Sequence, residues 1–173
     1  MKRVFVIIIS ALVIIILAYL IFSIADKARE QKIIKQNYNR LPAFAFKSLN
    51  GTLFSSTTIK SGPVLLIYFH PECEHCQYEL SEIFNSSLIK SGIWILMITP
   101  ADISSVLKFK KEYGIRDSSK IITLIDENLG FADLFGKASI PTNIVYNKEL
   151  KLVRMYKGEV RPEIIMKLIL DND

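Results

Sequence analysis

Two cysteines carry the clearest chemistry in this 173-residue chain. Cys73 and Cys76 are its only cysteines, and two residues separate them. The apolar run 63–69 precedes them, as in a strand buried on both faces, and apolar residues follow at helical spacing. This order places Cys73 at the start of a helix, where unpaired N–H groups and the helix dipole favour a thiolate. Two thiols held in this way are suited to disulfide exchange.

Strands and helices alternate on both sides of the cysteine pair. The Asn50–Gly51 dipeptide predicts the turn of a short hairpin formed by residues 43–46 and 52–54. An alternation that ends in a second hairpin predicts an α/β fold, a mixed sheet with helices on both faces. Strands are expected at 64–69, 93–98, 121–125, 142–146 and 152–156, and helices at 73–89, 102–113, 129–135 and 162–170.

The N-terminal part of the chain is apolar. Residues 4–25 carry no charge, and ~20 apolar residues suffice to cross a bilayer, so we expect one transmembrane helix. A cleaved signal peptide is the alternative, because residues 23–25 offer a small-x-small cleavage site. The predicted organisation is a membrane anchor or signal sequence at 1–25, a polar stalk at 26–40 and one domain at 41–173.

The charge distribution bears on orientation and partners. Basic residues flank both ends of the apolar segment, so their number alone does not fix its orientation. We expect the C-terminal domain on the periplasmic or extracytoplasmic side of the cell membrane, because a short basic head before an apolar core resembles an export signal and disulfides form there. Much of the net charge of +5 lies beside the apolar segment, either near anionic headgroups or on a solvated linker. The other basic residues are scattered among acids, which gives no sign of a nucleic-acid partner.

The cysteine segment resembles the active-site segment of the thioredoxin superfamily. It reads Gly-Pro-Val-Leu-Leu-Ile-Tyr-Phe-His-Pro-Glu-Cys-Glu-His-Cys over residues 62–76, and Ser-Ile-Pro-Thr at 139–142 resembles the loop that carries the superfamily's cis-proline. The anchor, the first hairpin and the insert at 93–125 are similar to the membrane-anchored TlpA/ResA-like branch, a redoxin domain. The resemblance covers about 41–170 and implies a thioredoxin-like fold with no bound cofactor besides a redox-active disulfide.

The resemblance also implies roles for the residues of the cysteine motif. Cys73 is the attacking thiol and Cys76 the resolving thiol. Glu79 reproduces the branch's Cys-Glu-x-Cys-x-x-Glu spacing and is expected to take a proton from Cys76; the alternative is a solvated helix residue paired with a lysine. His75 can favour the thiolate of Cys73, whereas the negative charges of Glu74 and Glu72 oppose it.

The Ile-Pro-Thr loop is expected to bind the substrate. Pro141 is assigned a cis peptide bond by the resemblance, and this turn brings backbone groups of Ile140 beside Cys73, where they can pair with an extended substrate segment. Thr142 completes the motif. Three positions depart from the pattern: Glu72 stands where the branch usually has Trp, and His70 and Pro71 stand where small residues are usual. Ile67 replaces the buried Asp of thioredoxin, for which Glu79 is a candidate substitute.

The expected function is a membrane-tethered thiol–disulfide oxidoreductase, which acts on exported cysteine proteins such as apocytochromes of cytochrome c biogenesis. We expect it to act as a reductant supplied by a membrane electron-transfer protein. A peroxiredoxin-like peroxidase is one alternative, although that family needs Thr or Ser three residues before its reactive cysteine, where this chain has His70. A copper or zinc chaperone is another, in which His70 and His75 join the two cysteines as ligands.

Overall fold

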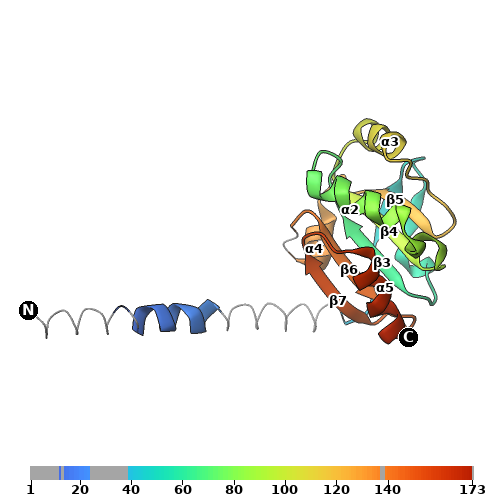
Figure 1. Cartoon of the computed structure of the whole chain (residues 1–173). Coiled ribbons are helices and arrows are strands. Elements are labelled where there is room, and N and C mark those ends of the chain that lie inside the picture. The colour runs from blue at the N-terminus through green and yellow to red at the C-terminus, as the bar shows by residue number, and fades with distance from the viewer. Residues whose placement is uncertain (1–11, 13, 24–38, 137–138, 173) are drawn as a thin grey trace, which may run out of the picture. The chain divides into compact units, whose positions relative to one another are not determined.

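The computed structural model describes residues 12, 14–23, 39–136 and 139–172 (Figure 1). The chain divides into two compact units, Met1–Asn37 and Tyr38–Asp173. In the first unit residues 14–23 are helical, with mostly exposed apolar side chains. No helix of the described part of the chain has the length and apolar character that a membrane crossing requires. Most of the predicted anchor and nearly all of the stalk lie outside the described residues.

The second unit is a sheet with helices packed against it (Figure 1). The strands are β1 (Ala45–Ser48), β2 (Leu53–Ser55), β3 (Val64–Tyr68), β4 (Trp94–Thr99), β5 (Ile121–Ile125), β6 (Thr142–Tyr146) and β7 (Leu152–Lys157). The helices are α2 (Glu74–Asn85), α3 (Ile103–Glu112), α4 (Gly130–Phe135) and α5 (Pro162–Asp171), and two short 3-10 helices are η1 (Ser56–Thr58) and η2 (Ser87–Lys90).

The order of the strands brings the two chemical motifs to the same end of two adjacent strands, β3 and β6. Among the described residues the order is β2-β1-β5-β4-β3-β6-β7, in which β3, β4 and β5 are parallel and the remaining pairs are antiparallel. Tyr68, the last residue of β3, lies opposite Thr142, the first residue of β6. Because the two strands run in opposite directions, the Ile140–Pro141 loop lies at the end of β3 from which the chain continues to Cys73.

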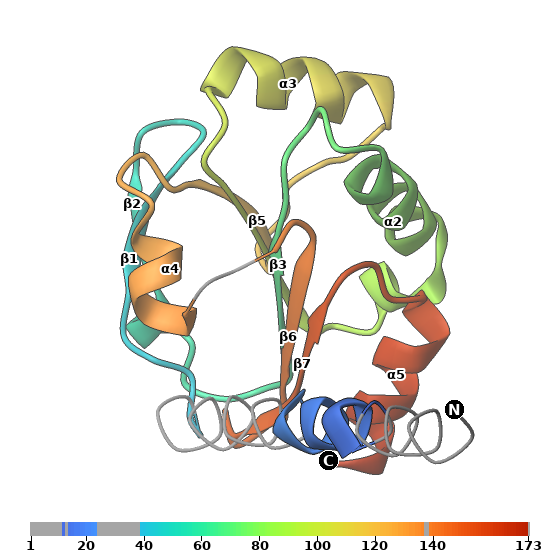
Figure 2. The ribbon, with the colours of Figure 1, turned by 90° about the vertical axis from the view of Figure 1, so that its left-hand side faces the viewer.

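The sheet buries apolar side chains on both faces. Leu65 and Ile67 of β3 belong to the core that α2 and α5 cover, whereas Leu66 and Tyr68 belong to the core that α4 covers. Figure 2 shows α2 and α5 on one side of the central strands and α4 on the other. A strand buried on both faces reads as a continuous apolar run, which is the pattern of residues 64–68. The predicted mixed sheet with helices on both faces is confirmed.

Most predicted elements are confirmed within one or two residues, but the helix after the cysteines is shorter than expected. It ends at Asn85 rather than near residue 89, because Ser86 interrupts it. The Ser86 hydroxyl donates to the Ile83 carbonyl at 2.7 Å and accepts from the Leu88 N–H at 3.1 Å, so it replaces helical hydrogen bonds and starts η2. The predicted cap of the next helix is confirmed, since Asp102 accepts from the Ser105 N–H at 3.0 Å.

Candidate active site

Cys73 is the residue that precedes the first turn of α2. It has extended backbone angles, its own N–H donates to the His70 carbonyl, and its carbonyl accepts the first helical hydrogen bond from the Gln77 N–H at 3.0 Å. Gln77 also donates to the Pro71 carbonyl at 2.8 Å, which ties the turn to the helix. The side chain of Cys73 is half-buried and makes no capping hydrogen bond. The sulfur that is expected to attack is therefore held at a helix N-terminus and remains reachable.

Cys76 lies one turn further on and is fully buried in the core between α2 and the sheet. Both cysteines are thiols in this structure. Burial raises the pKa of the Cys76 thiol far above its ordinary value. The hydrogen bond and charge of Cys73 and the charge of Glu79 raise it further, whereas the His70 backbone N–H lowers it. Cys76 is thus a buried thiol in which burial disfavours the thiolate form.

Glu79 is a buried carboxylate and not the solvated helix residue that was the alternative interpretation. Its side chain is only 2% exposed. Its Oε1 accepts from the Val160 N–H at 2.6 Å and from Asn143 Nδ2 at 2.7 Å, whereas Oε2 has no partner among the described residues. Burial raises the pKa of Glu79 to about 7, the two hydrogen bonds lower it in part, and Glu159 raises it. A group with this pKa can accept or release a proton near neutral pH.

Asn143 holds this carboxylate, and sequence reasoning missed it. Its side chain is fully buried on β6, opposite Ile67 of β3, and Nδ2 donates to both Glu79 Oε1 and the Gly158 carbonyl. The partner of the buried carboxylate is therefore the neighbour of Ile67 in the sheet, the position for which Glu79 was a candidate substitute. The available signal was an Asn inside an otherwise apolar strand, because a buried amide requires hydrogen-bond partners.

The segment between β7 and α5 joins Glu79 to the proline loop. Gly158, whose φ of +120° suits glycine, accepts from Asn143 and donates its N–H to the Pro141 carbonyl at 2.8 Å. The Ile140–Pro141 peptide bond is cis, as expected. Ile140 is 37% exposed, so it presents an apolar side chain to solvent at this loop. The Thr142 hydroxyl is buried and donates to the Ser139 carbonyl at 2.6 Å, so it shapes the loop. The roles of these residues in substrate binding stay predictions.

His75 faces the segment between β7 and α5. Its Nδ1 lies 3.0 Å from Glu159 Oε2, and its side chain is largely exposed. His70 makes a different contact, since its Nδ1 accepts from the Glu72 N–H at 3.3 Å within the turn before Cys73. Glu72 and Glu74 are exposed. Among the described residues no group of three or more His, Cys, Asp and Glu side chains is placed to hold a metal ion.

The arrangement is similar to several solved structures of thioredoxin-like proteins. A thiol:disulfide interchange protein of the thioredoxin family from Chlorobium tepidum aligns with a TM-score of 0.66 and 17% identity, over 78% of this chain and 95% of that one. A secreted disulfide oxidoreductase from Mycobacterium tuberculosis, described as homologous to E. coli DsbE, aligns with a TM-score of 0.62 and 15% identity, over 72% and 93%. The exposed lipoprotein thioredoxin of Streptococcus pneumoniae aligns with a TM-score of 0.55 and 22% identity, over 73% and 98%. At these identities the likeness shows a shared thioredoxin-like fold.

Sequence comparison gives the family. None of the curated proteins matches this sequence. The model of the AhpC/TSA family matches residues 38–155, a segment that runs from before β1 into β7 and includes both cysteines and the cis-proline. More than half of the chain is thus matched, and the protein is a member of the AhpC/TSA family of thioredoxin-fold redoxins.

Proposed function

We propose that this protein is a thiol–disulfide oxidoreductase that reduces disulfides of exported proteins through Cys73 and Cys76. One observation carries the proposal: a reachable thiol at a helix N-terminus precedes a fully buried thiol, whose neighbour Glu79 is a buried carboxylate with a pKa of about 7. The solved structures of similar fold support it, because those proteins are described as disulfide oxidoreductases and interchange proteins.

The reaction balances with the groups in the site. The Cys73 thiolate attacks one sulfur of the client disulfide, a Cys73–client bond forms, and the other client sulfur leaves as a thiolate. Cys76 then passes its proton to Glu79 Oε2, the carboxylate oxygen without a partner among the described residues, and attacks Cys73. The second client thiolate leaves, the Cys73–Cys76 disulfide forms, and two electrons have moved from the protein to the client.

The cycle needs an electron donor, for which we propose a membrane electron-transfer protein. The domain is tethered by residues 4–25 and faces the extracytoplasmic side in this proposal. The uncharged length of that segment and the dithiol chemistry support this location. Apocytochromes and other exported cysteine proteins are the proposed clients.

The site favours disulfide exchange over the peroxidase alternative. The position three residues before Cys73 holds His70, which accepts a hydrogen bond from the turn, whereas a peroxidase of the peroxiredoxin type needs a hydroxyl there. Dithiothreitol-dependent consumption of peroxide by the full chain, at a rate above that of its disulfide exchange, would favour the peroxidase. Zinc or copper that binds the wild type but not a variant without cysteines would favour the metal chaperone.

The reduction potential of the cysteine pair tests the proposed direction. The full chain is equilibrated in dithiothreitol or glutathione buffers, and the fraction of Cys73–Cys76 disulfide is measured by alkylation and mass spectrometry. A potential at or below ~−250 mV, near that of thioredoxin, supports a reductant. A potential near ~−120 mV, as in a strong oxidase, refutes the reductant role, and failure to form the disulfide refutes exchange altogether.

A further inference from the structure

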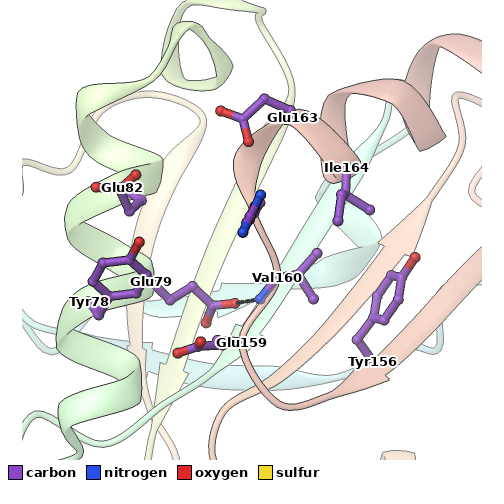
Figure 3. A pocket seen from close by; sticks show the side chains of 9 residues that line it. Tyr78, Glu79, Glu82, Tyr156, Glu159, Val160, Glu163 and Ile164 are labelled. Atoms are coloured by element: carbon purple, nitrogen blue, oxygen red, sulfur yellow. Dashed lines mark hydrogen bonds between the residues drawn. The ribbon is translucent and has the colours of Figure 1, made fainter.

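A groove with carboxylates on three sides lies between α2 and the start of α5 (Figure 3). It encloses about 630 Å³. The described residues that line it include four carboxylates, of which two come from α2, one from the β7–α5 segment and one from the first turn of α5 (Glu79, Glu82, Glu159 and Glu163). Arg161 is the one basic residue among them. Carboxylates thus outnumber basic residues in the groove, in a chain whose net charge is +5.

Two of these carboxylates have no direct partner among the described residues, although Arg161 lines the same groove. Neither Glu82 nor Glu163 has a hydrogen-bond or ion-pair partner among the described residues, whereas Glu159 pairs with His75. Of these two residues, only Glu163 is stabilised by a helix dipole, because it lies in the first turn of its helix. Carboxylates gathered in one groove repel one another, and a further bound cation relieves that repulsion.

A second observation points to a ligand. Glu79 is 98% buried and Figure 3 shows it at the groove beside Val160 and Glu159, yet Oε2 has no hydrogen-bond partner among the described residues. A buried polar atom normally has a partner. A cationic side chain in the groove would lie beside this carboxylate, which also accepts the Cys76 proton in the proposed reaction.

The remaining walls suit the stem of a long basic side chain. Tyr78 and Ile164 are exposed apolar residues of the groove, and Tyr156 contributes a second ring. The Arg154 guanidinium already lies 5.8 Å from the centroid of the Tyr156 ring, so Tyr156 contributes an aromatic wall and not a vacant cation site. Lys and Arg side chains pack their methylene stems on such surfaces and place the charged end among carboxylates.

We propose that this acidic groove binds a Lys or Arg side chain of the client polypeptide, near the client cysteine that reacts with Cys73. The inference rests on the proposed function and names its substrate class. Glu79 and Glu82 lie six and nine residues after Cys73 on a helix that rises ~1.5 Å per residue, so they lie ~9 to ~14 Å along its axis. An extended peptide covers ~3.3 Å per residue, so the basic residue stands ~3–4 positions from the client cysteine.

Peptide exchange tests this proposal. Each peptide carries one cysteine as a mixed disulfide with glutathione and either Lys or Gln three and four positions away on both sides, and a third peptide carries Lys only beside the cysteine. The rate constant of exchange with the reduced full chain is measured at low and high salt. We expect the peptide with distant Lys to react about three- to tenfold faster than the Gln peptide at low salt and the advantage to fall at high salt.

Matched variants locate the effect. Glu82→Gln with Glu163→Gln should remove most of the preference for Lys, whereas Glu112→Gln with Asp171→Asn, the same change of charge at exposed positions outside the groove, should retain it. Equal rates for the Lys and Gln peptides, or a preference that survives the groove variant, overturn the inference and leave exchange intact.

A cysteine-free version of the peptides separates this inference from the proposed function. Binding of the peptide with Ser in place of Cys is measured by fluorescence anisotropy on the full chain. Salt-sensitive binding that the groove variant loses supports the groove even if no peptide exchanges, in which case the proposed function alone fails. If the Ser peptides with Lys and Gln bind alike, or the groove variant keeps the preference, the groove proposal is refuted.

Discussion

Replacing Glu79 by Gln should remove a pH dependence of the protein's stability. Burial raises the pKa of this carboxyl to about 7 from its ordinary value of 4.5. Between these two values the folded protein holds the proton that the unfolded chain has released. The unfolded chain therefore binds fewer protons in this window, and the free energy of unfolding falls as the pH rises through it.

The size of the effect follows from the same two values. The interval from 4.5 to about 7, at ~1.4 kcal/mol for each pH unit, gives a loss of ~3 kcal/mol. The contribution is fully present below about pH 4 and is lost above about pH 8. Solvent does not screen it, because the side chain is only 2% exposed.

Urea unfolding of the full chain with both thiols kept reduced measures this difference. The free energy of unfolding is determined from about pH 5 to pH 8 for the wild type, for Glu79→Gln and for Glu112→Gln, an exposed residue of α3. The Gln amide costs stability at every pH, since it buries a donor, so the slopes with pH are compared and not the absolute values. The Glu112 variant should follow the wild type. If Glu79→Gln retains the full wild-type slope, the carboxyl does not titrate in this window and cannot serve as the proposed proton acceptor.

Three further experiments, one chemical modification and two substitutions, test the site and the packing around it. Iodoacetamide near neutral pH should modify the half-buried Cys73 at least ~tenfold faster than Cys76, whose burial raises its pKa, and mass spectrometry of digested protein at several times shows whether the rates differ. Asn143→Leu removes a hydrogen bond that lowers the pKa of Glu79, so the pH at which stability is lost should move upward; an unchanged midpoint would mean that the bond does not act on the carboxyl. Leu80→Ala empties a fully buried site on α2 and should cost ~2–5 kcal/mol in urea unfolding, and a cost below ~1 kcal/mol would contradict the packing of α2 on the sheet.

The buried strands could be predicted because their sequences leave few alternatives. Residues 64–68 and 94–99 are almost wholly apolar, which suits strands covered on both faces, and the helices between them have regular apolar spacing. The order of the strands in the sheet could not be predicted from such local patterns. The pairing of β1 with β5 joins residues 47 and 125, and no local pattern marks such distant partners.

Local side-chain hydrogen bonds explain where the sequence-based boundaries were wrong. The apolar residues up to Ile89 continue at helical spacing after Asn85, which favoured a longer helix. The Ser86 hydroxyl nevertheless bonds both the Ile83 carbonyl and the Leu88 N–H, so the backbone leaves the helix. A serine near the end of a periodic segment can signal such a break. The longer helix was predicted from the apolar periodicity alone.

Whether Glu79 is solvated or buried could be determined only from the fold. Its spacing from the cysteines predicts a position on α2 beyond Cys76, but a solvated and a buried carboxylate share that spacing. Glu79 can be buried because Asn143 and Val160 supply the hydrogen-bond donors for its Oε1 in the core. These two residues follow it in the chain by 64 and 81 positions. The backbone of the same segment holds the proline loop through Gly158 and Pro141. The proposed proton acceptor and the proposed client-binding loop are thus connected through contacts made only when β6, β7 and α5 have assembled on α2.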